Sequence, residues 1–180
     1  MKNTALLIVD VQVGLIEAPR HAYRGGEVVE RINSLITKAR ASGTPVIYMQ
    51  HDGGDESPVR VGSAGWEIHP EIAPAGGEPV FRKRASDSFH ETPLHEELAR
   101  RGVERLLVTG CRTDYCVDTT VRRAITLGYD VTLVKDAHTT VDNGVLSAAQ
   151  IIEHHNRTLD DFGTDEHVVN VRDSEEISFD

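Results

Sequence analysis

The sequence is poor in cysteine, and it has no long hydrophobic run. Its two cysteines, Cys111 and Cys116, are too few for the disulfide framework of a small secreted protein. No apolar stretch is long enough to cross a bilayer, and the opening Met1-Lys2-Asn3-Thr4 carries no apolar signal segment. We therefore expect a cytoplasmic protein whose cysteines stay reduced.

The chain also lacks an excess of positive charge. Its 19 Lys and Arg residues are outnumbered by 29 Asp and Glu residues, which gives a formal net charge of -10. Phosphate binding requires clustered basic residues, so we expect no nucleic-acid partner and no anionic membrane partner. The sequence has no Gly-x-Ser-x-Gly elbow, no P-loop and no Gly-x-Gly-x-x-Gly, so serine hydrolases, nucleotide hydrolases and dinucleotide oxidoreductases have no motif support.

What the sequence does contain is an alternation of strand and helix patterns. Short apolar runs predict strands at residues 5–10, 45–50, around 80, 105–109, 130–135 and 167–171. Apolar residues at helical spacing predict helices at residues 27–41, 94–101, 117–127 and 145–159. This βαβ pattern predicts one α/β domain over residues 1–180, with a mainly parallel six-stranded sheet between two helical layers.

The segment Gly110-Cys111-Arg112-Thr113-Asp114-Tyr115-Cys116-Val117 places a cysteine between a predicted strand and a predicted helix. The pattern makes Cys116 the residue that opens the helix. Unpaired N–H groups and the positive dipole end at that position favour an anion, which predicts a thiol pKa below the free value of about 8.5. The alternative is that Cys116 is a small, inert, buried side chain, as most cysteines are.

Two further polar residues follow predicted strands. Asp10 ends the apolar run at 5–9, where a turn residue or a helix N-cap is the alternative interpretation. Lys83 follows the short run at 80–82, where the alternative is an exposed lysine. Ligands of open parallel sheets bind beyond the carboxyl ends of the strands. Asp10, Lys83 and Cys116 can therefore line one crevice.

These residues, in this order and spacing, resemble a known family. The matching features are Asp10 with Gln12, Lys83 six residues before Phe89, and Gly-x-x-Thr-Asp-Tyr-Cys-Val ending around Cys116. From about residue 4 to residue 170 the chain resembles the isochorismatase-like cysteine hydrolases. The resemblance implies the three-layer, Rossmann-like fold of that family and a catalytic triad of Asp10, Lys83 and Cys116.

The resemblance also implies how the reaction is supported. The backbone N–H of Cys116, at the start of the helix, is well placed to bind a developing oxyanion. Family resemblance suggests the N–H of Arg112 as the second donor and a cis peptide bond between Cys111 and Arg112. It implies a homo-oligomer, either a dimer or a tetramer, and a structural role for Asp136.

The nucleophilic cysteine bears on the reaction class. Family members with a cysteine at this position are amidases, so Cys116 favours hydrolysis of a C–N bond in a small amide, carbamoyl compound or lactam through a thioester. Two alternatives stay open. The chain could be an isochorismatase-type ether hydrolase in which Cys116 is a spectator, or a binding module that kept the fold without catalysis.

We expect no metal and no cofactor. The related nicotinamidases carry an Asp-x-His metal motif after the second strand, and the matching residues here, His51-Asp52-Gly53-Gly54-Asp55, lack that order. The long loop over 51–78 is rich in Gly and Pro, which is typical of a lid over a small-molecule substrate. The candidate substrate-binding residues are Gln12, His51, Trp66, Phe89 and Tyr115. Trp66 either stacks on a substrate ring or anchors the loop.

Overall fold

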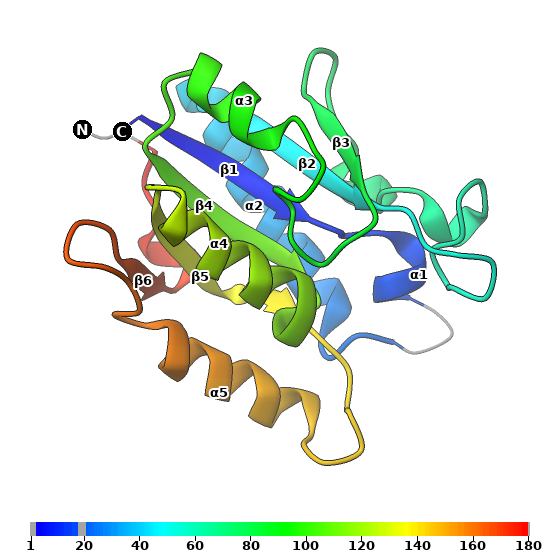
Figure 1. The fold of residues 1–180 in the computed structure, drawn as a ribbon. Helices are drawn as coiled ribbons and strands as arrows, with labels where there is room; N and C mark the ends of the chain where they lie inside the picture. Colours follow the sequence, from blue (N-terminus) through cyan, green and yellow to red (C-terminus); the bar gives the residue numbers. More distant parts are fainter. Residues whose placement is uncertain (1–2, 18–20, 180) are drawn as a thin grey trace.

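The structure is a computed structural model that describes residues 3–17 and 21–179. Helices and strands alternate along the chain (Figure 1). The strands are β1 (Thr4–Val9), β2 (Val46–His51), β3 (Val80–Lys83), β4 (Arg105–Cys111), β5 (Asp130–Thr139) and β6 (Val169–Arg172). The α-helices are α1 (Val13–Ile16), α2 (Gly25–Ser42), α3 (Leu94–Arg100), α4 (Asp118–Thr126) and α5 (Ala148–Leu159). None of the helices in the described ranges is long and apolar enough to cross a membrane.

All six strands form one sheet in the order β3-β2-β1-β4-β5-β6, and every neighbouring pair is parallel. Parallel strands need crossover connections, and the helices between the strands supply them on both faces of the sheet. The predicted α/β fold with a six-stranded parallel sheet is therefore confirmed.

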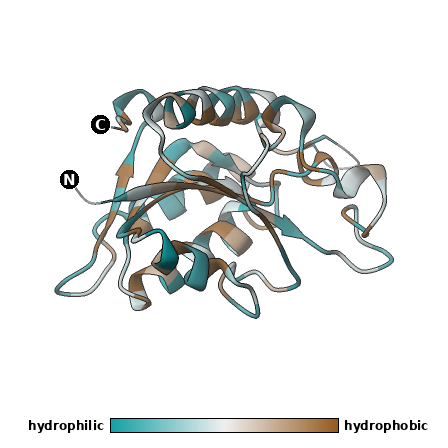
Figure 2. Cartoon of the chain, turned by 90° about the horizontal axis from the view of Figure 1, so that it is seen from above, coloured by the Kyte–Doolittle hydropathy of each residue, from teal (hydrophilic) through white to brown (hydrophobic). Residues whose placement is uncertain are grey.

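The core consists of two apolar layers, one on each face of the sheet. Alternate residues of β1 point to opposite faces, so Leu6 and Ile8 pack in the layer of α2, whereas Leu7 and Val9 pack in the layer of α3, α4 and α5. Figure 2 shows the sheet between these helical layers, with hydrophobic colour along the strands. Strands buried on both faces read as continuous apolar runs, which is why the central strands were visible in the sequence.

The sheet extends further than the sequence pattern indicates. The predicted fifth strand ends at residue 135, but β5 continues to Thr139, and His138 pairs with Gly110 of β4. The apolar run ends at Lys135, which is exposed, and at Asp136, which is partly buried. The predicted strand end is wrong because the backbone of β5 pairs with β4 beyond the last residue of the apolar run. As a result, the end of β5 lies beside the end of β4.

Two helix boundaries also differ from the prediction. A turn of π-helix (Thr113–Val117) precedes α4, so Cys116 lies within that turn and does not open the α-helix. The helix predicted from residue 145 begins at Ala148, because Ser147 and Gln150 form a capping box at its start. The four-residue α1 is too short to produce a helical period in the sequence.

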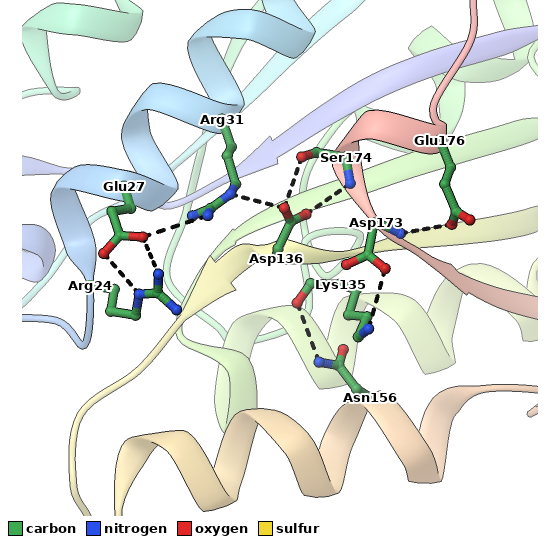
Figure 3. A network of polar contacts seen from close by, with 9 residues as sticks. All are labelled: Arg24, Glu27, Arg31, Lys135, Asp136, Asn156, Asp173, Ser174 and Glu176. Carbon is green, nitrogen blue, oxygen red and sulfur yellow. Dashed lines mark hydrogen bonds and ion pairs between the residues drawn. The ribbon is translucent and has the colours of Figure 1, made fainter.

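Asp136 joins three elements of the fold (Figure 3). Its Oδ2 atom lies 2.9 Å from Nε of Arg31 on α2, and its carboxylate accepts hydrogen bonds from the N–H and the hydroxyl of Ser174, each at 2.9 Å. These contacts hold the segment after β6 against β5 and α2. The carboxylate therefore serves the packing of the fold, as the resemblance implies.

The loop over 51–78 is packed against α1. A side chain at Gly14 or at Gly65 would come within 2.2 Å or 2.1 Å of the Pro58 carbonyl oxygen, so both positions need glycine for this close approach. Two backbone hydrogen bonds add to it, from Val13 N–H to the Glu67 carbonyl and from His69 N–H to the Val11 carbonyl. The loop is thus tied to the rest of the domain along its length.

Candidate active site

The strand order explains how distant residues meet at one edge of the sheet. Asp10 follows β1, His51 ends β2, Lys83 ends β3, and Cys116 lies in the turn after β4. Because these four strands are neighbours and parallel, their carboxyl ends lie side by side. The structure brings Asp10, Lys83 and Cys116 together, as the sequence predicts, and it adds His51 to the group.

Asp10 and Lys83 form a fully buried ion pair. Nζ of Lys83 lies 2.6 Å from Oδ2 of Asp10, and neither side chain has exposed surface. The ammonium also donates to the carbonyls of Ala85 (2.9 Å) and Ser86 (3.5 Å). Burial lowers the pKa of Lys83, but the Asp10 carboxylate and the Cys116 sulfur outweigh it, so the pKa is raised and the ammonium keeps its charge.

The carboxylate of Asp10 is held in an unusual way. Asp10 has a left-handed backbone with φ of 51°, which is uncommon for a residue other than glycine and is often found at functional sites. Apart from the ion pair with Lys83, its oxygens have no hydrogen-bond partner among the described residues. Burial raises the pKa of Asp10, and Lys83 opposes the rise. A carboxylate with so few partners is able to accept a proton.

Cys116 is partly exposed and interacts with both charged groups. Burial, assisted by the Asp10 carboxylate, raises the pKa of Cys116 to about 12, and Lys83 opposes this rise. The prediction that a helix start lowers the thiol pKa is therefore wrong, because desolvation and the carboxylate outweigh the other contributions. The thiol is neutral at rest, and its activation requires transfer of the proton to a base.

His51 lies between the strands that carry Asp10 and Lys83. One ligating atom each of His51, Asp10 and Cys116 lies within 4.8 Å of the other two. Burial lowers the pKa of His51, and Asp10 opposes this shift. The imidazole Nδ1 is buried without a hydrogen-bond partner among the described residues. A neutral imidazole thus faces the thiol and the carboxylate.

The same three side chains could in principle ligate a metal ion. However, the Lys83 ammonium already occupies one oxygen of Asp10, and its positive charge opposes a cation at that carboxylate. Asp52 is also engaged, because it accepts two hydrogen bonds from Nε and one from Nη2 of Arg82, at 2.7–3.0 Å. The absence of a metal site stays a prediction, and these contacts are in line with it.

Gln12 and Trp66 anchor the loop beside the site. The side-chain amide of Gln12 donates to the carbonyls of His51 (3.0 Å) and Trp66 (2.7 Å), and its oxygen accepts from the His51 N–H (2.9 Å). The Trp66 indole donates to Asp52 at 3.0 Å, and the guanidinium of Arg82 lies 5.1 Å from its ring centroid. Of the two roles weighed for Trp66, these contacts match anchoring.

The two other aromatic candidates lie in different surroundings. Phe89 is buried in the core, where its ring stacks on Tyr129 at a centroid distance of 6.0 Å. Tyr115, in the turn that holds Cys116, is 56% exposed and points away from the core. Within the described residues, neither aromatic side chain forms a polar contact with the triad, and their substrate-binding roles stay predictions.

The backbone before the nucleophile has the form that the resemblance implies. The peptide bond between Cys111 and Arg112 is cis. Gly110 has a φ of 128°, and a side chain there would lie 2.0 Å from the carbonyl oxygen of Val9. Glycine thus lets the end of β4 approach the end of β1, next to Asp10. Arg112 comes just after β4 and Cys116 lies in the turn that follows, so their backbone N–H groups lie in the segment expected to form the oxyanion hole.

A cavity of about 360 Å³ lies beside the triad. It is lined by Asp52, Arg82, Lys83, Arg84, Ala85, His90 and Glu91. Sequence reasoning missed Arg82, which lines this cavity. Its guanidinium donates hydrogen bonds to Asp52 and lies over the ring of Trp66. Only the strand alternation at 80–83, which turns Arg82 outward and Lys83 inward, could have drawn attention to it.

Comparisons with known proteins show the family of the chain. The family model for the Isochorismatase domain matches residues 4–160. A streptothricin hydrolase of Streptomyces noursei is 36% identical over 138 residues, which are 77% of this chain and 50% of that protein. The chain spans about half the length of the streptothricin hydrolases that it matches.

Solved structures share the whole fold. The crystal structure of an isochorismatase from Pseudomonas putida KT2440 has a TM-score of 0.88 and 32% sequence identity, covering 97% of this chain and 90% of that chain. The N-carbamoylsarcosine amidase of Thermoplasma acidophilum has a TM-score of 0.79 and 26% identity, covering 98% and 99%.

Proposed function

Because the chain belongs to the isochorismatase family of hydrolases, we propose that it cleaves a C–N bond of a small amide or carbamoyl compound through a thioester on Cys116. The observation that carries this proposal is the buried Asp10 carboxylate, which lies 2.6 Å from the Lys83 ammonium and within 4.8 Å of the Cys116 sulfur. A cation, a base and a nucleophile brought together are the groups that acyl transfer through a thioester needs.

The reaction begins with proton transfer. Because the Cys116 thiol is neutral at rest, Asp10 takes its proton as Sγ attacks the carbonyl carbon of the substrate. The carbonyl oxygen gains the negative charge, and the N–H groups of Cys116 and Arg112 bind it. Lys83 favours the ionised form of Asp10 before the transfer, which keeps the base available.

The tetrahedral adduct then collapses. The C–N bond breaks, Asp10 passes its proton to the leaving nitrogen, and the acyl group stays on Cys116 as a thioester. In the second half, Asp10 takes a proton from water, the resulting hydroxide attacks the thioester carbon, and the thiolate leaves and regains the proton from Asp10. The products are an amine or ammonia and a carboxylic acid.

One relative supports a C–N bond as the target. N-carbamoylsarcosine amidase is an amidase by name, whereas the name of streptothricin hydrolase gives only the reaction class of a hydrolase. We assign Gln12 a positioning role within this reaction, because all the hydrogen bonds of its amide hold backbone groups of the loop and of β2. The cytoplasmic location and a homo-oligomer of two or four chains remain part of the proposal, and light scattering of the purified protein tests the second.

The alternative of an ether hydrolase has one observation in its favour, which is the likeness to the Pseudomonas putida structure described as an isochorismatase. In that reaction Cys116 would be a spectator. The third alternative, a binding module, requires that the contact between Asp10, Lys83 and Cys116 has no catalytic use.

Ammonia release from a panel of small amides and carbamoyl compounds tests the proposal. We expect at least one compound to be hydrolysed by the wild type, and turnover to fall by about 10⁴-fold or more in Cys116→Ala, because loss of a nucleophile removes the covalent route. Cys111→Ala is the matched control, since Cys111 is buried in β4 outside the triad. If isochorismate is consumed equally by both Cys116 forms and no amide is hydrolysed, the ether hydrolase is the correct assignment.

A further inference from the structure

A chain of buried hydrogen bonds connects the nucleophile turn to helix α5. Thr113, the first residue of the turn that contains Cys116, is 1% exposed, and its Oγ1 lies 2.8 Å from Nδ1 of His138 on β5. The other ring nitrogen, Nε2 of His138, lies 2.9 Å from Oδ1 of Asn156 on α5. Nδ2 of Asn156 donates to the carbonyl of Lys135 at 3.2 Å.

The partners fix the direction of every bond in this chain. Asn156 uses its N–H to reach the Lys135 carbonyl, so its Oδ1 faces His138 and can only accept. Nε2 of His138 must therefore carry the hydrogen, which leaves Nδ1 unprotonated. An unprotonated Nδ1 accepts, so the Thr113 hydroxyl donates to it. Burial lowers the pKa of His138 to about 4, in agreement with a neutral ring.

We propose that His138 is a positioning residue for the proposed hydrolase, and that its Nδ1 atom holds the nucleophile turn by accepting the hydrogen bond of Thr113. This inference rests on the proposed function, because the turn matters only if Cys116 reacts. Thr113 begins the five-residue turn, and its hydroxyl has no other hydrogen-bond partner among the described residues. Without the acceptor, the buried hydroxyl would lose its hydrogen bond and the turn would shift to satisfy it.

A second hydrogen bond holds the same turn at a different residue, so it does not replace the bond between Thr113 and His138. Oγ1 of Thr140, just after β5, donates to Oδ1 of Asp114 at 2.6 Å. This bond fixes Asp114, the half-buried second residue of the turn. The bond to His138 fixes Thr113, the buried first residue. Catalytic groups that are misplaced by about 1 Å can lose about 10²-fold in rate, so a small shift of the turn has a large effect on Sγ.

Two substitutions at His138 separate the acceptor from the rest of the side chain. His138→Asn keeps an acceptor oxygen near the place of Nδ1, but it loses the donor to Asn156. His138→Gln keeps a donor near the place of Nε2, but it has no acceptor at the place of Nδ1. Both replace a buried ring by an amide, and Asn leaves the larger cavity, so the rates are compared together with the thermal stability of each variant.

We expect His138→Gln to lower both kcat for the best amide of the panel and the rate of Cys116 alkylation by iodoacetamide at neutral pH by about tenfold or more, with KM changed less than threefold. His138→Asn should stay within about threefold of the wild type in both measurements. Thr113→Val should behave like His138→Gln, and Thr113→Ser, which keeps the hydroxyl, should restore the rates.

Equal losses in His138→Asn and His138→Gln, in proportion to their thermal stability, would overturn the proposal and leave His138 a packing residue. Wild-type rates in His138→Gln would also overturn it. The alkylation rate requires no substrate, so it reports on the turn even if no amide is hydrolysed, and failure of the proposed function is recognised separately by the amide panel. Cys116→Ala identifies the alkylated thiol, because Cys111 is buried.

Discussion

Asp10 directly follows β1 and Asp136 lies in the second half of β5, and the fold uses these two aspartates in opposite ways. The Asp10 side chain has no exposed surface and one ammonium beside it, and its carboxylate accepts no hydrogen bond from the described backbone. The side chain of Asp136 is 27% exposed and is bound by Arg31 and by two donors of Ser174 (Figure 3). The Asp10 carboxylate is able to accept a proton, whereas the Asp136 carboxylate holds α2 and the segment after β6 against β5.

This contrast shows how an active-site acid can be distinguished from a structural one. A structural carboxylate gains stability from each donor, so the fold surrounds it with donors. A catalytic base must accept a proton during the reaction, and every additional donor would lower its pKa and weaken it as a base. The few partners of Asp10 are therefore a sign of function that its burial alone does not give.

Among the substitutions that test this contrast, Asp10→Asn is expected to have the largest effect. The amide has the same shape and cannot accept the thiol proton, so kcat for the best amide should fall by about 10³-fold, within the usual range for a general acid–base group. Removing the charge also leaves Lys83 buried without its counter-ion, which lowers the stability of the fold. Steady-state kinetics and urea unfolding measure both effects.

The double variant Asp10→Asn with Lys83→Met separates these two effects. It removes the unpaired ammonium, so it should regain stability relative to Asp10→Asn but no activity. If Asp10→Asn keeps activity within tenfold of the wild type, Asp10 is a structural carboxylate like Asp136 and the comparison fails.

Lys83→Met should have the next largest effect and should move the pH profile. Lys83 lowers the pKa of Asp10, so its removal raises that pKa further. Because Asp10 acts in its ionised form, activity appears only as the pH rises through the pKa, and the acidic limb of the kcat/KM profile should shift to higher pH. At neutral pH we expect a loss of about 10²-fold, as for other acid–base groups. An unshifted acidic limb would mean that the limb reports another group.

The smallest effect on catalysis is expected from Asp136→Ala. Removing this carboxylate leaves the hydroxyl of Ser174 and the guanidinium of Arg31 without their acceptor, which should cost about 1–3 kcal/mol of unfolding free energy in urea titrations. Turnover per folded molecule should stay within about twofold. Glu153→Ala, which removes the exposed partner of Arg157 on α5, is the control and should cost less. A large loss of turnover in Asp136→Ala at unchanged stability would contradict the division of roles.

Much of the fold and of the candidate site could be predicted from the sequence. The parallel sheet followed from continuous apolar runs, and Asp10, Lys83 and Cys116 could be placed together because each follows a strand of a parallel sheet. The extension of β5 to Thr139 could not be predicted, since it depends on backbone pairing with β4. The five-residue π-helical turn is too short to leave a period in the side chains.

Two features of the site were beyond sequence reasoning for the same kind of reason. The raised pKa of Cys116 follows from burial and from the charge of Asp10, and neither is visible in the local motif. Thr113 and His138 are 25 residues apart, so their hydrogen bond appears only once the ends of β4 and β5 lie side by side. By contrast, the capping box of Ser147 and Gln150 is a local signal that would have placed the start of α5 correctly.

The most direct test of the account is the intact mass of the protein during turnover. Wild-type protein would be mixed with the best amide of the panel, quenched in acid within the first turnover, and analysed by mass spectrometry with peptide mapping. We predict a mass increase equal to the acyl part of the substrate, located on Cys116 and absent from Cys116→Ala. Hydrolysis that continues in Cys116→Ala, with no adduct on the wild type, would contradict the thioester mechanism.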